Sequence, residues 1–489
     1  MWLTETLKFG SKIAITDSIG SFSYQNLYQE AEKIAHFLLN HFQTEHLQER
    51  RIAFLFNASF KYVATQWAIW RAGGIAVPLC PTHPRHEIEY VLQDADCSLL
   101  LTENEFLPLL KEIFIPTFLY QQAESKPIYN LPQISPSQRA LIIYTSGTTG
   151  KPKGVVSTHR NIETQIRTLV EAWEWSEKDR ILHILPLHHI HGIINALSCA
   201  LYAGAEVVFL PKFDAEKVWQ YWQEQSFTIF MAVPTVYSRL IDVWEKSEKS
   251  KQEAMRQACR KMRLMISGSA ALPVSVLEKW QHISGHFLLE RYGMSEIGMA
   301  ISNPLHGRRK AGKVGLPLLG VAVRLVDENG NILPQGEVGE IQVKGENVFL
   351  EYWRKPDATA ESFTADGWFR TGDTAVQDEE GYFKILGRTS TDIIKTGGYK
   401  VSAIEIEETL RQHPNIADCA VVGIPDEEWG EKVTAFVVLK EQKTLSLQEL
   451  RFWAKNFLAH YKVPTQMQIV TEFPRNAMGK VMKKKLAIQ

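Results

Sequence analysis

The stretch ALIIYTSGTTGKPKGVV (residues 140–156) joins two unlike kinds of sequence. Its first part, ALIIY (140–144), is an apolar run that predicts a buried β-strand. The following residues are rich in glycine, serine, threonine and lysine, which is typical of a loop with exposed N–H groups and hydroxyls. Ligands bind beyond the carboxyl ends of strands in parallel sheets. Such a loop at that edge can surround phosphate oxygens, while Lys151 and Lys153 supply positive charge.

The spacing of the glycines excludes one common phosphate loop. A Walker A loop needs four residues between its two glycines, whereas two residues separate Gly147 from Gly150. Composition alone therefore leaves open a flexible surface hairpin as the alternative to a phosphate-binding loop.

Short apolar runs and helical segments alternate from about residue 50 to residue 300. The alternation predicts βαβ units and an α/β fold, in which helices cover largely parallel sheets. The helical segments include NIETQIRTLVEAW (161–173) and VSVLEKWQHI (274–283). The predicted strands are RIAFLF (51–56), SLLLTE (98–103), DRILHILP (179–186), AEVVFLP (205–211), FTIFMAVP (227–234) and KMRLMISGS (261–269).

The pattern changes after about residue 310. Residues 321–345 alternate with period two around an Asn-Gly turn, which predicts a small antiparallel β unit. GRTSTD (387–392) is typical of a linker, and the remaining residues, about 100 in number, predict a compact α+β domain. The last three lysines of KVMKKKL (480–486) are expected to form a solvated tail.

Global composition narrows the possible partners and the compartment. The 489 residues include 54 Lys and Arg and 55 Asp and Glu, so nothing favours nucleic acid or a charged membrane surface. Five scattered cysteines, an odd number without a CxxC motif, predict a reducing compartment without a structural metal. The N-terminus has no signal-peptide core. The longest apolar stretch (191–210) is interrupted by polar residues, which favours a core helix followed by a strand over a membrane span. We therefore expect a soluble cytoplasmic protein. Its oligomeric state is not predicted.

Four motifs in order along the chain resemble the adenylate-forming superfamily, which includes acyl-CoA synthetases, peptide-synthetase adenylation domains and luciferases. They are TSGTTGKPKG (145–154), RYGMSE (291–296), FRTGD (369–373) and PRNAMGK (474–480). The resemblance implies a large N-terminal domain (1–388, with its β-rich part at about 310–388) and a small mobile C-terminal lid (389–489). It also implies ATP, Mg²⁺ and coenzyme A as small-molecule reactants and cofactors.

The resemblance assigns roles residue by residue. It implies that Glu296, with Thr145, holds Mg²⁺, that Lys480 drives adenylation, and that His189 gates the acyl pocket, so that Lys480, Thr145 and His189 are the catalytic set. The implied nucleotide contacts are Thr145, Ser146, Gly147, Thr148, Thr149, Gly150, Lys151, Lys153, Ser269, Tyr292, Gly293, Met294, Ser295, Asp373 and Arg388. Among them, the resemblance implies that Tyr292 lies against adenine, that Ser295 binds phosphate, and that Asp373 and Arg388 bind the ribose.

The chemistry gives these residue types a reason. A carboxylate is a poor electrophile, but its attack on the α-phosphate of ATP makes an acyl-adenylate whose leaving group is AMP. Negative charge accumulates around the α-phosphorus, because the attacking carboxylate and the departing pyrophosphate are both anions. Positioning and charge neutralisation by lysine, hydroxyls and Mg²⁺ therefore carry the reaction.

The second half-reaction in this superfamily forms the thioester after the small domain rotates. TGGYK (396–400) resembles the segment that then faces the site, and the resemblance assigns Gly397, Gly398, Tyr399 and Lys400 to coenzyme A. GRTSTDIIKTGG (387–398) has one more residue before the glycines than the commoner GRxDD pattern. Both Ser390 and Thr391 therefore stay candidates for the hinge.

Arg291 suggests which acid is used. A buried guanidinium is costly unless it is paired with an anion, and a second carboxylate on the substrate would pair with it. His191 could donate to the same carboxylate, with Ser267 nearby. LPLHHIHGIINAL (185–197) and ERYGMSEIGMA (290–300) resemble the malonyl-CoA synthetase subfamily. We expect malonate as the substrate, with methylmalonate as a second candidate.

Several alternatives stay open. Arg291 could pair with Glu290 and never meet substrate, and His191 could be a satisfied core histidine. The enzyme could activate another medium-chain, aryl or dicarboxylic acid, or could load a carrier protein. A non-catalytic protein of the same fold is the remaining alternative, which the joint presence of Lys480, Glu296 and Asp373 disfavours.

Overall fold

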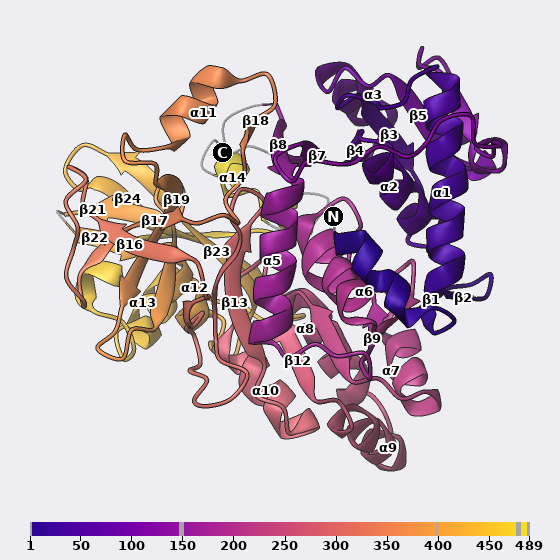
Figure 1. The fold of residues 1–489 in the computed structure, drawn as a ribbon. Coiled ribbons are helices and arrows are strands. Elements are labelled where there is room, and N and C mark those ends of the chain that lie inside the picture. The colour runs from indigo at the N-terminus through magenta and orange to yellow at the C-terminus, as the bar shows by residue number, and fades with distance from the viewer. Residues whose placement is uncertain (1, 146–150, 398, 476–480, 487–489) are drawn as a thin grey trace. The chain divides into compact units, whose positions relative to one another are not determined.

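The computed structural model describes residues 2–145, 151–397, 399–475 and 481–486, and it divides into two compact units (Figure 1). The first unit comprises Met1–Ala322 and Val343–Phe369, and the second comprises Val323–Gln342 and Arg370–Gln489. The predicted domain limits at residues 388 and 389 stay a prediction, because these compact units group the β-rich segment differently.

A seven-stranded sheet, counted over the described residues, holds the predicted phosphate-loop strand. Its order is β18-β8-β7-β4-β3-β5-β6. β3, β4 and β5 run parallel, and β7 pairs parallel with β4 but antiparallel with β8. The strands are β3 (Arg51–Leu55), β4 (Ile75–Pro78), β5 (Leu99–Thr102), β6 (Thr117–Leu119), β7 (Arg139–Thr145), β8 (Lys153–Thr158) and β18 (Glu351–Tyr352).

The second sheet of this unit has nine strands among the described residues, in the order β15-β14-β13-β12-β11-β9-β10-β1-β2. Its centre is parallel, as the apolar runs predicted, and β13 and β14 form an antiparallel hairpin at one side. The strands are β1 (Ile13–Thr16), β2 (Ser21–Ser23), β9 (Arg180–His183), β10 (Glu206–Phe209), β11 (Ile229–Ala232), β12 (Leu264–Ser267), β13 (Leu289–Met294), β14 (Gly298–Ser302) and β15 (Leu316–Pro317).

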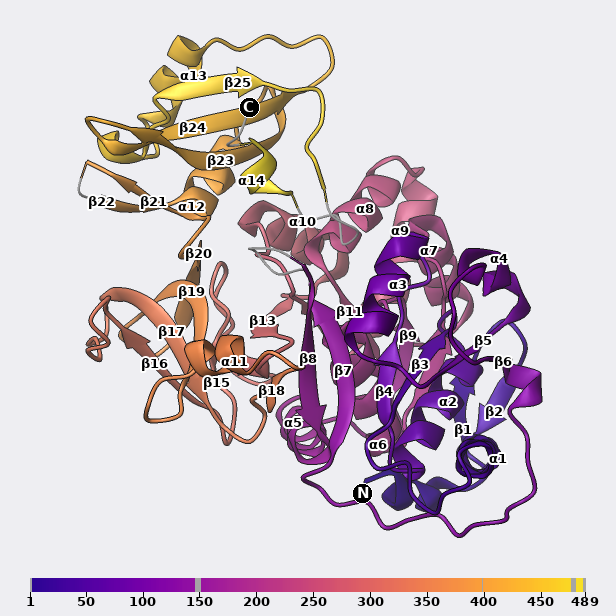
Figure 2. The same ribbon diagram turned by 90° about the horizontal axis from the view of Figure 1, so that it is seen from above.

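Helices cover these sheets, as Figure 2 shows from a second direction, so the predicted α/β alternation is confirmed. The α-helices are α1 (Tyr24–His41), α2 (Phe60–Arg71), α3 (Arg85–Asp94), α4 (Leu107–Leu110), α5 (His159–Ala172), α6 (Cys199–Ala203), α7 (Ala215–Glu224), α8 (Pro234–Glu245), α9 (Lys249–Arg260), α10 (Val274–Ser284) and α11 (Pro356–Ser362). Single-turn and irregular helices are η1 (Trp2–Phe9), η2 (Asn104–Phe106), η3 (Tyr120–Gln122) and η4 (His191–Ser198).

Local sequence explains where key helices begin. Thr158 ends β8 and accepts a hydrogen bond from the Asn161 backbone N–H, while the Asn161 side chain accepts from the Thr158 N–H. This reciprocal pair satisfies N–H groups that a helix start leaves unpaired. A core containing Trp219, Trp222 and Trp280 packs α7 and α10 against the nine-stranded sheet.

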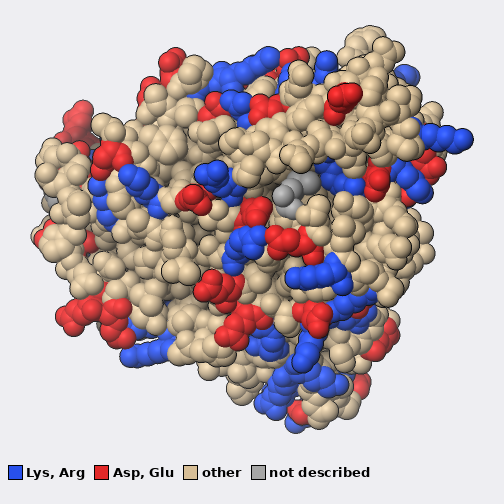
Figure 3. Space-filling view, in the orientation of Figure 1, with Lys and Arg blue, Asp and Glu red and all other residues tan. Residues whose placement is uncertain are grey.

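The long apolar stretch at 191–210 folds as predicted, as a core helix followed by a strand. It forms the π-helix η4, then α6, then β10, and every residue of η4 is buried. No described helix is both long enough and apolar enough to cross a membrane. Figure 3 shows one face of the protein, on which basic and acidic side chains are interspersed.

The second unit holds two sheets in its described part. One has the order β16-β17-β19-β20, and the other the order β22-β21-β24-β23, with β25 paired to β24. The strands are β16 (Ala322–Val326), β17 (Val338–Lys344), β19 (Phe369–Gln377), β20 (Phe383–Arg388), β21 (Ile393–Thr396), β22 (Tyr399–Ser402), β23 (Ile416–Asp426), β24 (Gly430–Leu439) and β25 (Gln466–Ile469). The helices are α12 (Ala403–Leu410), α13 (Leu447–Ala454), η5 (His460–Lys462) and α14 (Lys483–Leu486).

One expectation about the tail was wrong. Lys483 is not solvated, because its side chain is only 14% exposed and its ammonium lies 2.6 Å from Asp392 Oδ1 and 2.7 Å from Glu407 Oε1. Burial alone would lower the pKa of Lys483, but attraction by Glu407 and Asp392 outweighs it and raises that pKa. The lysine thus neutralises two buried carboxylates. Lys485 is exposed, as expected.

Candidate active site

The residues that flank the predicted phosphate loop, Thr145 and Lys151, are both described. Thr145 ends β7 and pairs with Lys153 at the start of β8, and the Thr145 hydroxyl donates to the Lys153 carbonyl at 3.5 Å. The Lys151 ammonium lies 5.6 Å from the ring centre of Tyr90. The predicted contacts Ser146, Gly147, Thr148, Thr149 and Gly150 lie outside the described residues.

Tyr352 connects the acidic and basic groups of this region. Its hydroxyl donates to Glu296 Oε1 at 2.9 Å, and the Lys153 ammonium lies 4.9 Å from the centre of its ring. Glu296 is 6% exposed and stands in the turn after β13. One carboxylate of this kind, completed by phosphate and water oxygens, fits the ligand preferences of Mg²⁺. Sequence reasoning missed Tyr352, because no motif marks it.

The RYGMSE motif forms the β13–β14 hairpin. Tyr292, Gly293, Met294 and Ser295 are all partly exposed, and the pairing register shifts between Tyr292 and Gly293. A Cβ on Gly293 would lie 2.0 Å from the Gly298 carbonyl oxygen, so only glycine fits there. The hairpin thus presents a run of residues that are not buried, at the predicted adenine and phosphate position.

Arg291 lies directly before this run but is buried. Its guanidinium packs flat on Gly268, where an added Cβ would lie 2.2 Å from Nη1. Nε and Nη2 are buried without a hydrogen-bond partner in the described structure. Burial lowers the pKa of Arg291 to about 9, against the opposing effects of Glu290 and Tyr237, so it remains a cation at neutral pH.

Ser269 and His191 complete what we call the Arg291 cluster. Arg291 Nη1 donates to Ser269 Oγ at 3.5 Å, and Ser269 Oγ lies 3.2 Å from His191 Nδ1. Burial, and then the charge of Arg291, hold the pKa of His191 well below its usual value. If the neutral ring accepts from Ser269 at Nδ1, its hydrogen is on Nε2, which is buried without a partner in the described structure. The cluster therefore presents unsatisfied donors on two of its side chains.

The geometry of η4 holds His191 in place. A Cβ on Gly192 would lie 2.3 Å from the Pro186 carbonyl oxygen, so the segment before η4 folds tightly against its first turn. π-Helical turns are rare and occur frequently at functional sites. His191 is the first residue of this one.

The remaining predicted acyl-site residues lie close by in the chain. Burial lowers the pKa of His189 to about 4, and its Nε2 has no partner among the described residues. Ser267 ends β12 just before Gly268, and its buried hydroxyl likewise has no partner in the described part of the chain. His189 therefore lies beside His191 in sequence, and Ser267 beside the glycine that supports Arg291.

The predicted ribose residues form a pair in the second unit. Asp373 and Arg388 are partners across β19 and β20, and Arg388 Nε lies 3.0 Å from Asp373 Oδ1. Arg388 Nη1 also donates to the Thr371 carbonyl at 2.6 Å. Asp373 is 7% exposed, so the pairing orients a carboxylate that the fold largely buries.

The hinge and thioester residues follow this pair. Ser390 and Thr391 lie between β20 and β21, and the Thr391 N–H donates to the Arg388 carbonyl at 3.1 Å. Gly397 has φ +54 in the β21–β22 hairpin, and the Tyr399 ring stacks on Tyr461 with 4.2 Å between centres. Lys480, Gly398 and the side chain of Lys400 lie outside the described residues.

Comparisons with known proteins agree along the chain. The family described as AMP-binding enzyme matches residues 4–353, and the AMP-binding enzyme C-terminal domain matches residues 405–480. The mitochondrial malonate–CoA ligase ACSF3 of Mus musculus is 47% identical, with 99% of this chain and 89% of that protein covered. The malonate–CoA ligase of Arabidopsis thaliana is 43% identical, with 97% and 86% covered. The crystal structure of ATP-bound MatB from Rhodopseudomonas palustris matches at 34% identity with a TM-score of 0.89, covering 100% of this chain and 99% of that one.

Proposed function

The chain belongs to the AMP-binding enzyme family, and from this premise we propose that it is a malonate–CoA ligase. The resemblance that its motifs predicted is thereby confirmed. The reaction converts malonate, ATP and coenzyme A into malonyl-CoA, AMP and pyrophosphate through a malonyl-adenylate. The relatives of Mus musculus and Arabidopsis thaliana carry the name of this activity and are similar over nearly the full chain.

The observation that carries the choice of acid is the Arg291 cluster. Arg291 is 2% exposed, and two of its nitrogens have no hydrogen-bond partner among the described residues. A buried cation with unsatisfied donors is costly to the fold unless a ligand completes it. We assign to this cluster the carboxylate of malonate that does not react. An acid with a neutral tail would leave the same donors unsatisfied.

The other residues receive roles in the two steps. We assign Lys480 to the reacting carboxylate and the α-phosphate, and the hydroxyls and N–H groups of residues 145–150 to pyrophosphate. Mg²⁺, when bound at Glu296, neutralises phosphate charge during the first step. Asp373 is assigned to the ribose hydroxyls with Arg388 orienting it, and the Gly397–Lys400 hairpin to the pantetheine arm of coenzyme A.

Pyrophosphate release across a panel of acids tests this proposal. Purified protein with ATP, Mg²⁺ and coenzyme A is assayed with malonate, methylmalonate, succinate, acetate, octanoate and coumarate. We expect the highest kcat/KM for malonate. We also expect activity with methylmalonate, because both of its carboxylates are attached to one carbon, as in malonate. A maximum for a monocarboxylate would overturn the assignment of the acid while leaving the adenylation chemistry intact.

Arg291→Ala sharpens the test. Malonate kcat/KM should fall by about 2–5 kcal/mol, the range for losing one member of a buried charge pair, or roughly 30- to 5,000-fold. ATP affinity, measured without acid, should change little. An equal loss for malonate and acetate would show that Arg291 acts on the fold instead.

The acceptor of the acyl group is tested separately with the wild-type protein. Activity with a carrier protein but not with free coenzyme A would indicate a carrier-loading enzyme.

We also propose a cytoplasmic location, as the cysteines suggested. All five are free thiols, which fits a reducing compartment. The relative of Mus musculus is named as mitochondrial, so fractionation of the source cells decides between the two compartments.

A further inference from the structure

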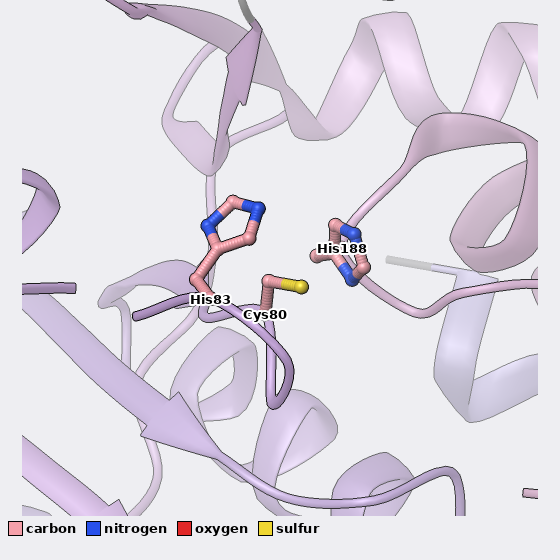
Figure 4. A group of neighbouring side chains, drawn as sticks. All are labelled: Cys80, His83 and His188. Carbon is pink, nitrogen blue, oxygen red and sulfur yellow. The ribbon is translucent and has the colours of Figure 1, made fainter. Parts of the chain in front are cut away.

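Three side chains outside the assigned roles converge in the first unit. Cys80 and His83 stand on the loop between β4 and α3, and His188 stands on the segment between β9 and η4. One potential ligand atom from each lies within 4.8 Å of the others. Figure 4 shows the Cys80 sulfur directed toward His188 across the space between the two loops. The loops belong to different sheets, so the cluster bridges them.

The ligand atoms are largely free to bind. His188 makes no hydrogen bond within the described part of the chain, and its ring lies beside the rings of His83 and His189. His83 Nδ1 lies 3.2 Å from Oε2 of Glu87, which is in the first turn of α3, so His83 Nε2 is the available nitrogen. Carboxylates orient metal-bound histidines through this kind of contact. Cys80 Sγ lies 3.2 Å from the Thr82 hydroxyl, and the thiol also forms a hydrogen bond with His83.

We propose that Cys80, His83 and His188 bind one Zn²⁺, or a divalent ion of similar softness, and leave a fourth position for water. Thiolate and imidazole are the ligands that Zn²⁺ prefers, and three protein ligands with one open position form a common arrangement. Tetrahedral zinc with Zn–S of about 2.3 Å and Zn–N of about 2.0–2.1 Å separates its ligands by roughly 3.3–3.8 Å. Because the three ligand atoms lie within 4.8 Å of one another, they need to approach by at most about 1.5 Å to reach this geometry. Binding releases the Cys80 proton to solvent as the zinc–sulfur bond forms.

The pKa of the Cys80 thiol is shifted downward, whereas burial raises the pKa of the other thiols of this chain. A lower pKa favours the thiolate that binds a metal. Burial raises the pKa of Cys80, but hydrogen bonds with His83 and Thr82 outweigh it, and the pKa lies below its ordinary value. Burial raises the pKa of Cys97 to about 12, and that thiol has no histidine among the groups that shift it. Cys97 is therefore a matched control for the experiment below.

Metal binding has a consequence for catalysis that rests on the proposed function. The ring centres of His188 and His189 lie 4.2 Å apart, and His189 is the expected gate of the acyl site. His191 of the Arg291 cluster follows two residues later. A metal at His188 would tie this segment to the loop at 80–83, and we expect Zn²⁺ to slow malonate turnover reversibly, with recovery on adding a chelator.

Equilibrium dialysis of the purified full chain against Zn²⁺ alone tests the site without any substrate. We expect one Zn²⁺ per chain in the wild type and in Cys97→Ser, and at least about 100-fold weaker binding in Cys80→Ser and in His188→Asn. Glu87→Gln should weaken binding by about tenfold, the lower end of the range for residues that orient a ligand. Co²⁺ as a second probe should give sulfur-to-metal charge-transfer absorption that Cys80→Ser lacks. Circular dichroism establishes that each variant is folded.

The outcomes separate this proposal from the proposed function. Absence of stoichiometric Zn²⁺ binding, or binding that persists in both Cys80→Ser and His188→Asn, overturns the site whatever acid the enzyme uses. Zn²⁺ binding by the wild type without malonate activity would support the site and overturn the function. Inhibition by Zn²⁺ that Cys80→Ser retains would overturn the link between this site and turnover.

Discussion

Arg291 is a cation that the fold buries on the face of Gly268 while Nε and Nη2 find no partner in the described structure. Replacing buried charges with apolar side chains of similar volume is often neutral or stabilising. We therefore expect Arg291→Met to raise the free energy of unfolding without substrate, by about 1–4 kcal/mol, although malonate use falls. Thermal unfolding with and without malonate measures both effects, because malonate should stabilise the wild type only.

Arg309 provides the matched control for this prediction. Its guanidinium donates to three backbone carbonyls, those of Pro304, Phe287 and Leu305. Arg309→Met leaves these acceptors without their donors, so it should lower the unfolding temperature. Destabilisation by Arg291→Met of the same size as by Arg309→Met would mean that Arg291 serves the fold and not a ligand.

Ser269 has φ +66, in the left-handed region that favours glycine. Ser269→Ala and Ser269→Gly both remove the hydroxyl between Arg291 and His191, so both should raise the KM for malonate, by up to about tenfold. Only alanine keeps the backbone strain, so its unfolding free energy should be lower than that of the glycine variant by about 1 kcal/mol. Equal malonate affinity in the wild type and both variants would show that the hydroxyl does not organise the cluster.

The sequence indicates that Arg291 is functional, because it directly precedes Tyr292 and a buried guanidinium is costly unless an anion pairs with it. It does not indicate Tyr352, which reaches Glu296 from a strand 56 residues further along the chain. Cys80 and His188 are still further apart in sequence and meet only because loops of two sheets converge. Short motifs report residues that act together within one loop, whereas contacts between distant loops depend on the tertiary fold.

At the scale of elements, Lys483 in α14 links the tail to the segment after β20. It contacts Asp392 and Glu407, which are 8% and 6% exposed. Lys483→Met removes the cation that Asp392 and Glu407 share, while Arg411 still lies 3.4 Å from Glu407, so we expect a loss of up to about 3–5 kcal/mol in the stability of the second unit. Denaturant unfolding followed by hydrogen exchange in β23 measures it. Lys485→Met, at an exposed position of the same helix, should change stability by less than about 0.5 kcal/mol.

The pH dependence of this contact has a definite sign. The pKa of Lys483 is raised in the folded protein by Glu407 and Asp392, against the effect of burial. The contribution of Lys483 to the free energy of unfolding is therefore complete below the unfolded-state pKa of about 10.4. It is lost as pH rises through the folded-state pKa. The stability difference between wild type and Lys483→Met should stay constant from about pH 6 to pH 9 and shrink above about pH 10.4. A difference that grows with pH would contradict the ion pair.

Strands and helices followed their sequence patterns closely, and the lysine tail did not. Apolar runs such as ALIIY are buried in almost any fold, so β7 could be predicted from composition and length. Three consecutive lysines read alone predict solvent exposure. Lys483 turns inward because Asp392 and Glu407 lie beside it, and no local pattern in the tail contains that information.

At the scale of the whole molecule, the assigned groups are divided between two units. Glu296, the Arg291 cluster and Thr145 belong to the first, while Asp373, the hinge candidates and the Gly397–Lys400 hairpin belong to the second. Lys480 and Gly397 are both assigned to chemistry at the same acyl group, but in different half-reactions. If Lys480 serves only adenylation and Gly397 only thioester formation, a mutation of either residue should impair one step and spare the other.

Lys480→Ala should separate them. Without its ammonium the charge at the α-phosphorus is not neutralised, so malonate-dependent pyrophosphate release should fall by at least about 100-fold, a loss of roughly 2.7 kcal/mol in transition-state stabilisation. Thioester formation from supplied malonyl-AMP and coenzyme A needs no such charge and should keep most of its rate. Single-turnover assays of each half-reaction measure the two rates independently. Gly397→Trp, which blocks the thioester hairpin, should give the reverse pattern, and failure of both half-reactions in both variants would show that one residue set serves both steps.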